Sequence, residues 1–100
     1  MLPQFRKLEA EEVDRALEIR IKVFVEEQKV PLEEEKDEYD QKSQHFGVFI
    51  GTQMVGTARL FSSGKLGKIG RIAILKEFRR RGLGTRLIQE IVARANSQGI

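Results

Sequence analysis

The chain has 100 residues, of which 40% are hydrophobic and 33% are charged, with a formal net charge of +3 and no cysteine. A chain of this length forms one small core, and without cysteine it has no disulfide framework and no thiolate nucleophile. The sequence contains no run of about 18 apolar residues and no signal-peptide pattern. We therefore expect a cytoplasmic protein with no membrane span.

The first half of the sequence predicts a strand, a helix and an acidic loop. Residues 5–8 favour a short strand, and residues 9–28 predict an amphipathic helix. Its apolar positions recur every three or four residues at Val13, Leu17, Ile21 and Phe24. Pro31 blocks continuation of this helix, and residues 29–42 form a polar loop with the acidic run Glu33, Glu34 and Glu35. This run is either a solvated surface or a face that attracts a cationic ligand.

Three strands and a second helix follow. The strands are expected at residues 45–50, 54–62 and 68–75, and they are separated by short turns rich in Gly, Ser and Thr. The second helix begins at Leu83, because the apolar positions from there onward recur at helical spacing. The order β-α-β-β-β-α predicts an α/β (α+β) fold, in which helices flank a mixed, mainly antiparallel sheet. We expect residues 1–100 to form a single domain.

A basic turn with two glycines connects the last strand to the second helix, and we interpret it as a phosphate cradle. A helix N-terminus offers unpaired N–H groups and a partial charge of about +0.5, while glycines let a phosphate approach the backbone. The candidate cradle residues are Arg79, Arg80, Arg81, Gly82, Leu83, Gly84 and Thr85. The alternative interpretation is a solvated turn whose glycines serve the backbone alone.

Two other phosphate-binding motifs fit this turn poorly. A P-loop requires a lysine after its last glycine, and Thr85 follows Gly84 here. A dinucleotide-binding turn requires a third glycine at position 87, which is Leu87. The turn is therefore unlike either nucleotide-binding motif.

The order of strand, Arg-x-x-Gly-x-Gly turn and amphipathic helix resembles the acyl-coenzyme A site of the GNAT superfamily of N-acetyltransferases. Arg79, Gly82 and Gly84 fill the signature. The segment from Ile19 to Gln28, followed by Val30-Pro31 and the acidic run, is similar to the first helix and loop of small bacterial members. The resemblance implies transfer of an acetyl group from acetyl-CoA to a primary amine by direct attack on the thioester, without a metal.

The resemblance also implies roles for individual residues. The amides of the turn hold the coenzyme A pyrophosphate, and Ile72, Ala73 and Ile74 lie beside the pantetheine arm. The backbone N–H of Ile74, at a bulge in the strand, would stabilise the oxyanion. The ammonium group of the acceptor must lose a proton, and Glu26, Glu27 and the acidic loop are the candidate bases.

The resemblance further implies that the chain is the N-terminal portion of the domain. Complete members continue after this helix with another strand, so we expect residues 98–100 to cap the helix and the C-terminal part to be missing. The free edge of strand 68–75 would then be covered in a homodimer or by a complementing C-terminal fragment. The alternative function is a non-catalytic acyl-CoA-binding fragment, or an assembly module completed by a partner strand.

The charges are divided unevenly along the chain. Residues 1–50 carry eight Lys/Arg against thirteen Asp/Glu, and residues 51–100 carry ten against two. Such asymmetry can indicate a nucleic-acid partner. Here the basic half contains the proposed pyrophosphate cradle and the acidic half suits a cationic amine, so we expect acetyl-CoA and an amine acceptor, and no nucleic acid.

Overall fold

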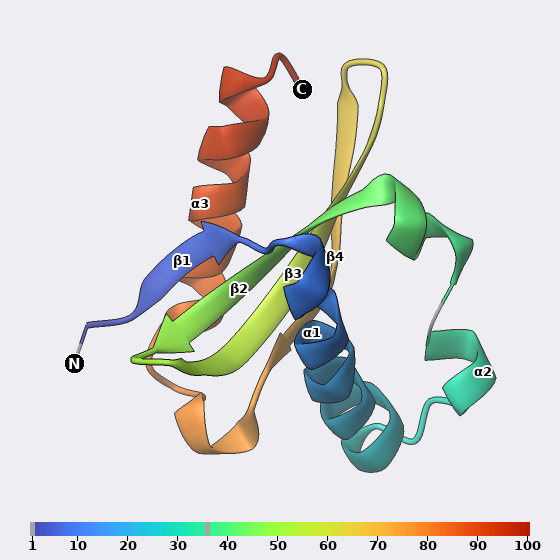
Figure 1. The fold of residues 1–100 in the computed structure, drawn as a ribbon, viewed down its shortest axis with the longest axis vertical. Helices are drawn as coiled ribbons and strands as arrows, with labels where there is room; N and C mark the ends of the chain where they lie inside the picture. Colours follow the sequence, from blue (N-terminus) through green and yellow to red (C-terminus); the bar gives the residue numbers. More distant parts are fainter. Residues whose placement is uncertain (1, 36) are drawn as a thin grey trace.

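The structure, a computed structural model, describes residues 2–35 and 37–100. Four strands form one antiparallel sheet: β1 (Gln4–Lys7), β2 (Ser43–Ile50), β3 (Gln53–Ser63) and β4 (Leu66–Ile74). The spatial order is β1-β2-β3-β4, so each strand pairs only with its neighbours in the sequence (Figure 1). Within the described residues, β4 therefore lies at one edge of the sheet. The predicted mainly antiparallel sheet is confirmed, and all strand pairs in the described residues are antiparallel.

A continuous helical segment after β1 covers one face of the sheet. It runs from Ala10–Glu12 (η1) through α1 (Val13–Arg20) into Ile21–Glu27 (η2), whose hydrogen bonds are π-helical. A π-helix is defined by hydrogen bonds between residues five apart. At the end of η2, the N–H of Gln28 donates to the carbonyl of Val23, five residues back, at 3.2 Å. The expected long helix is present, and its last two turns differ from a regular α-helix.

The acidic segment before β2 is more structured than the loop we expected. It contains two short helices, α2 (Leu32–Glu35) and η3 (Glu38–Lys42). Asp37 caps the second of these, because its carboxylate accepts the N–H of Tyr39 at 3.0 Å. The side chain of Glu35 is only 2% exposed, so the interpretation of the run as a solvated surface does not hold for this residue, whereas Glu33 and Glu34 are exposed.

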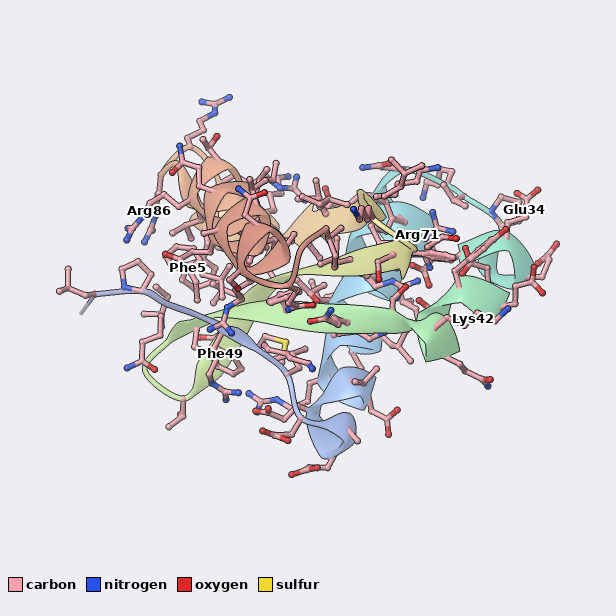
Figure 2. The ribbon with its side chains drawn as sticks, turned by 90° about the horizontal axis from the view of Figure 1, so that it is seen from above. Phe5, Glu34, Lys42, Phe49, Arg71 and Arg86 are labelled. Atoms are coloured by element: carbon pink, nitrogen blue, oxygen red, sulfur yellow. The ribbon has the colours of Figure 1, made fainter. Side chains whose placement is uncertain are left out.

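Helix α3 (Leu83–Ser97) covers the opposite face of the sheet from α1, as Figures 1 and 2 show. It begins at the residue where the sequence predicts the start. Its C-terminus is closed by Gly99, which adopts a φ of 79° and lets the N–H of Ile100 donate to Ala95 at 2.9 Å. Among residues 2–35 and 37–100, no helix is long and apolar enough to cross a bilayer.

The sheet separates two apolar clusters, one beneath each helix layer. The cluster against α3 contains Phe46, Val48, Val55, Ala58, Leu60, Leu83, Leu87, Ile91 and Ala95. The cluster against α1 and η2 contains Leu8, Ala16, Ile19, Val23, Phe49, Met54 and Ala73. Because both layers pack on the same strands, the turn from β4 to α3 is held between two packed elements at its ends.

Candidate functional site

The N-terminus of α3 is open and has no protein cap. Gly82 occupies the cap position with a φ of 74°, a left-handed conformation that a glycine adopts without steric cost. The first intrahelical bond runs from the N–H of Arg86 to the carbonyl of Gly82 at 3.1 Å. The N–H groups of Leu83, Gly84 and Thr85 thus have no acceptor within the helix. These are the groups that can bind an anion.

The two glycines of this turn have different surroundings. A Cβ placed on Gly82 would meet no atom within 4 Å, so only the backbone conformation requires a glycine there. A Cβ on Gly84 would lie 3.8 Å from Cγ1 of Ile74, which is an ordinary contact distance. The protein itself therefore leaves room above the turn, and a methyl group fits at Gly84 without displacing a neighbour.

The three arginines of the turn also differ. Arg80 is exposed, has a φ of 64°, and makes no ion pair with any described residue. The guanidinium of Arg81 lies 5.3 Å from the centre of the Phe78 ring, and its Nη2 donates to the carbonyl of Glu77 at 3.4 Å. Arg80 and Arg81 thus keep most of their hydrogen-bonding capacity for a ligand.

Arg79 is held by the protein. Its Nη1 and Nη2 donate to the two carboxylate oxygens of Glu27 at 2.9 Å each, and its Nε donates to the carbonyl of Ile74 at 2.8 Å. The hydrogen bonds from Arg79 lower the pKa of Glu27, and the same pair raises the pKa of Arg79. Two of the candidate site residues are therefore bound to each other, and Glu27 is a weaker base than an unpaired glutamate.

The backbone of Ile74 faces the open edge of the sheet. The N–H of Leu75 donates to the carbonyl of Val55 at 2.9 Å, and Ile74 lies opposite Gly56 on β3. Because backbone groups alternate in direction along a strand, the N–H of Ile74 points away from β3. Gly56 makes room for this residue, since a Cβ there would lie 2.5 Å from Cδ1 of Ile74.

The bulge in β4 occurs earlier than we expected. The register with β3 shifts between Thr57 and Arg59, opposite the part of β4 that contains Arg71, and Arg71 has a φ of 52°. Its side chain contacts the acidic segment, where Nε donates to the carbonyl of Glu35 at 3.1 Å and Nη2 donates to Oδ2 of Asp37 at 3.1 Å. The bulge therefore lies three residues before Ile74, and contacts with the acidic segment accompany it.

A buried ion cluster, unforeseen from the sequence, holds the acidic segment on the sheet. Arg20 of α1 is 1% exposed and donates to Glu35 at 2.6 Å and to Asp40 at 2.7 Å. Arg59 of β3 donates to Asp40 at 2.9 Å and to both oxygens of Asp37 at 2.7 and 2.9 Å. Burial would raise the pKa of Asp40, but the hydrogen bonds and charge of Arg20, with those of Arg59, hold it at about 2.

A signal for this cluster was present in the sequence. Arg20 lies one position from the apolar stripe of the first helix, which is unusual for an unpaired charge. The carboxylates that pair with it lie 15 and 20 residues further along the chain. Of the other candidate bases, Glu26 is exposed, and no hydrogen bond or ion pair reaches its carboxylate from the described residues.

Comparison with solved structures identifies the fold. Over 96% of this chain and 71% of the other, the structure matches Escherichia coli ElaA with a TM-score of 0.83 at 21% identity. It matches a GNAT family acetyltransferase from Brucella melitensis, solved in complex with acetyl-CoA, with a TM-score of 0.84 at 15% identity, over 98% of this chain and 71% of that one. These likenesses show a shared fold.

Sequence comparison identifies the family. The chain is 38% identical over 89 residues to the uncharacterized N-acetyltransferase YjcF of Bacillus subtilis (strain 168), which covers 89% of this chain. The chain spans less than two thirds of the length of the curated relatives it matches, and 63% of the length of YjcF. The sequence model of the acetyltransferase (GNAT) family matches residues 10–100. The chain belongs to the acetyltransferase (GNAT) family.

Proposed function

We propose that this chain provides the acetyl-CoA-binding turn and the oxyanion strand of an enzyme that transfers an acetyl group to a primary amine. The observation that carries the proposal is the uncapped N-terminus of α3, where three free N–H groups follow the left-handed Gly82. In the proposal, these amides bind the coenzyme A pyrophosphate. Arg80 and Arg81 add positive charge at its rim, and Ile72, Ala73 and Ile74 flank the pantetheine arm.

The chemistry requires little from side chains. The neutral amine attacks the thioester carbon, a C–N bond forms, and the C–S bond breaks to release the coenzyme A thiolate, which takes up a proton. Holding the two reactants together contributes roughly 7 to 11 kcal/mol. The N–H of Ile74, directed away from β3, is the proposed donor to the developing oxyanion.

The proposed base is Glu26 rather than Glu27. A general base works best when its pKa lies near the operating pH, and the pairing with Arg79 lowers the pKa of Glu27. We assign Arg79 and Glu27 a positioning role, because the guanidinium connects the end of η2 to the carbonyl of Ile74. Arg79 still has N–H groups left over for a phosphate oxygen, so a direct contact with coenzyme A remains part of the proposal.

The edge of β4 is the proposed assembly surface. In the described residues it pairs with β3 only, and natural proteins cover such edges. Pairing with the same strand of a second chain would give a homodimer, and pairing with a separate C-terminal segment would complete the pantetheine slot. If neither forms, the alternative function is acyl-CoA binding without turnover.

A matched pair of glycine variants tests the proposal. Gly82 and Gly99 flank the two ends of α3, have φ values of 74° and 79°, and would each place an added Cβ where no other atom lies within 4 Å. Valine strains both positions similarly, but only Gly82→Val alters the proposed cradle. Calorimetry should show coenzyme A binding lost in Gly82→Val and kept in Gly99→Val. Equal affinity in both variants would remove the cradle assignment.

A further inference from the structure

A cavity of about 530 Å³ lies between the acidic segment and the hairpin of β3 and β4. Its walls include Asp37 and Tyr39 near η3, Arg59 and Phe61 on β3, and Lys68 and Arg71 on β4. Figure 2 shows Arg71 on the side of the molecule toward Glu34 and away from Arg86 of α3. The cavity is thus distinct from the proposed coenzyme A turn.

Among the described residues that line the cavity, Asp37 is the only carboxylate, and its acceptor positions are already filled. A carboxylate has about four acceptor positions. Oδ1 of Asp37 accepts the N–H of Tyr39 at 3.0 Å and Nη1 of Arg59 at 2.7 Å. Oδ2 accepts Nη2 of Arg59 at 2.9 Å and Nη2 of Arg71 at 3.1 Å. Asp37 therefore has no position left for the ammonium group of a ligand.

Hydrogen-bond donors, by contrast, remain free in this cavity. The side chain of Lys68 is exposed, and its ammonium group makes no ion pair or hydrogen bond with the part of the chain that the structure describes. Arg71 uses Nε and Nη2 for the protein, so both N–H groups of Nη1 remain available. The cavity thus offers free cationic donors and no free carboxylate among the described residues, which suits an anion.

An aromatic surface lies beside these donors. The rings of Tyr39 and Phe61 meet edge to face with their centres 4.9 Å apart. Tyr39 remains 43% exposed, so part of its ring is open to the cavity. A ligand with a flat apolar body can cover this surface while its charged end meets Lys68 and Arg71.

We propose that this cavity selects the acceptor, and that the acceptor is an amine carrying a carboxylate at its other end. The inference rests on the proposed acetyl transfer, since it names the acceptor for that reaction. Arg71 lies three residues before Ile74 on β4, a span of at most about 10 Å, because the bulge at Arg71 shortens the path along the strand. The carboxylate binds Lys68 and Arg71, the apolar body lies on Tyr39 and Phe61, and the amine extends toward the thioester at Ile74.

This assignment replaces the cationic acceptor that the acidic run suggested. The negative charges of Glu35, Asp37 and Asp40 are each paired with Arg20, Arg59 or Arg71. These three carboxylates therefore attract a diamine little, and the exposed Glu33 and Glu34 of the acidic run are not part of the cavity wall. Lys68, by contrast, adds a net positive charge at the cavity.

The test uses three rigid amines of the same shape on the unaltered chain: 4-(aminomethyl)benzoate, 4-(aminomethyl)benzamide and 1,4-bis(aminomethyl)benzene. Binding is measured without acetyl-CoA by amide chemical shifts, which also report the location. The benzoate should bind about tenfold more tightly than the benzamide, with shifts at Tyr39, Phe61 and Lys68. Equal binding of the two, or preference for the diamine, would overturn the inference.

A pair of lysine variants adds a second readout. Lys68→Gln should reduce the preference for the benzoate to about twofold or less, whereas Lys65→Gln, an exposed lysine outside the cavity wall, should leave it unchanged. A preserved preference in Lys68→Gln would contradict the site. Acetyl transfer is assayed separately by thiol release. Selective binding without transfer would reject the proposed function alone, and transfer without selectivity would reject this inference alone.

Discussion

Arg79 binds both carboxylate oxygens of Glu27 at 2.9 Å, although the two residues are 52 positions apart in the sequence. Their pairing fixes the end of η2 to the turn after β4. Because Nε of Arg79 also holds the carbonyl of Ile74, the pair orients the backbone that we assign to the oxyanion. The first residue of the signature thus contributes to the shape of the site before any ligand binds.

This pairing predicts a mild effect for Glu27→Gln. The pairing with Arg79 lowers the pKa of Glu27, so the residue is a poor general base and its loss should reduce kcat by less than about tenfold. Removing a true general base costs roughly 10² to 10⁴ in rate. The pH dependence of kcat/KM checks this, with Glu26→Gln as the comparison. A loss above a hundredfold in Glu27→Gln, with disappearance of the acidic limb of the profile, would assign the base to Glu27.

The buried ion cluster predicts a large stability loss for Arg20→Leu. The substitution leaves Glu35 and Asp40 buried without their main partner, and breaking a buried pair costs about 3 to 5 kcal/mol. The control is Arg6→Leu, which breaks the ion pair of the 41% exposed Arg6 with Glu12 and should cost much less, because solvent screens an exposed pair. Urea unfolding measures both. Similar losses of unfolding free energy in the two variants would contradict the conclusion that burial makes the Arg20 pairs more important.

The same cluster predicts acid sensitivity. The pKa of Asp40 is about 2 in the folded chain, below the value of about 3.9 for an unfolded aspartate. Its contribution to stability is therefore complete above about pH 4 and is lost as the pH falls toward 2, when the folded state must take up protons. Urea unfolding between pH 7 and pH 2.5 should show constant stability down to about pH 5 and a fall below pH 4. A flat profile throughout would refute the assignment.

The two signature glycines predict opposite effects of alanine. Gly82→Ala should destabilise the chain, because a Cβ at a φ of 74° is strained. Gly84→Ala should stabilise it by up to about 1 kcal/mol, because alanine is the better helix former and its Cβ meets nothing closer than 3.8 Å. Thermal unfolding checks this, because Gly84→Ala should have a higher melting temperature than Gly82→Ala. A lower melting temperature for Gly84→Ala than for Gly82→Ala would be inconsistent with the geometry.

Local patterns predicted most of the fold. Alternating strands, short turns and the apolar stripe that starts at Leu83 depend on neighbouring residues, and the structure confirms them. The helix also begins within the glycine turn, as predicted, and the structure adds that Gly82 is left-handed. Elements of this kind are determined by spacing within a few residues, so a single sequence contains the information.

The charged contacts could not be predicted in the same way. In the sequence, Glu35 is one of three consecutive glutamates, a pattern typical of a solvated surface. Its burial is possible because Arg20 of α1 donates a hydrogen bond to its carboxylate. Likewise, the pairing of Glu27 with Arg79 and the position of the bulge at Arg71 depend on segments that are distant in the sequence. Such partners become known only when the fold brings them together, and they determine which groups are free to bind.

The strand order has a consequence for the rate and order of folding. Strands β2, β3 and β4 are consecutive in the chain and adjacent in the sheet, so their pairing closes only short loops and costs little chain entropy. β1, in contrast, must pair with β2 across the whole helical and acidic region. We therefore expect β2, β3 and β4 to form the folding nucleus first. β1 and α1 would dock afterwards, when Arg20 of α1 pairs with the carboxylates of Glu35 and Asp40.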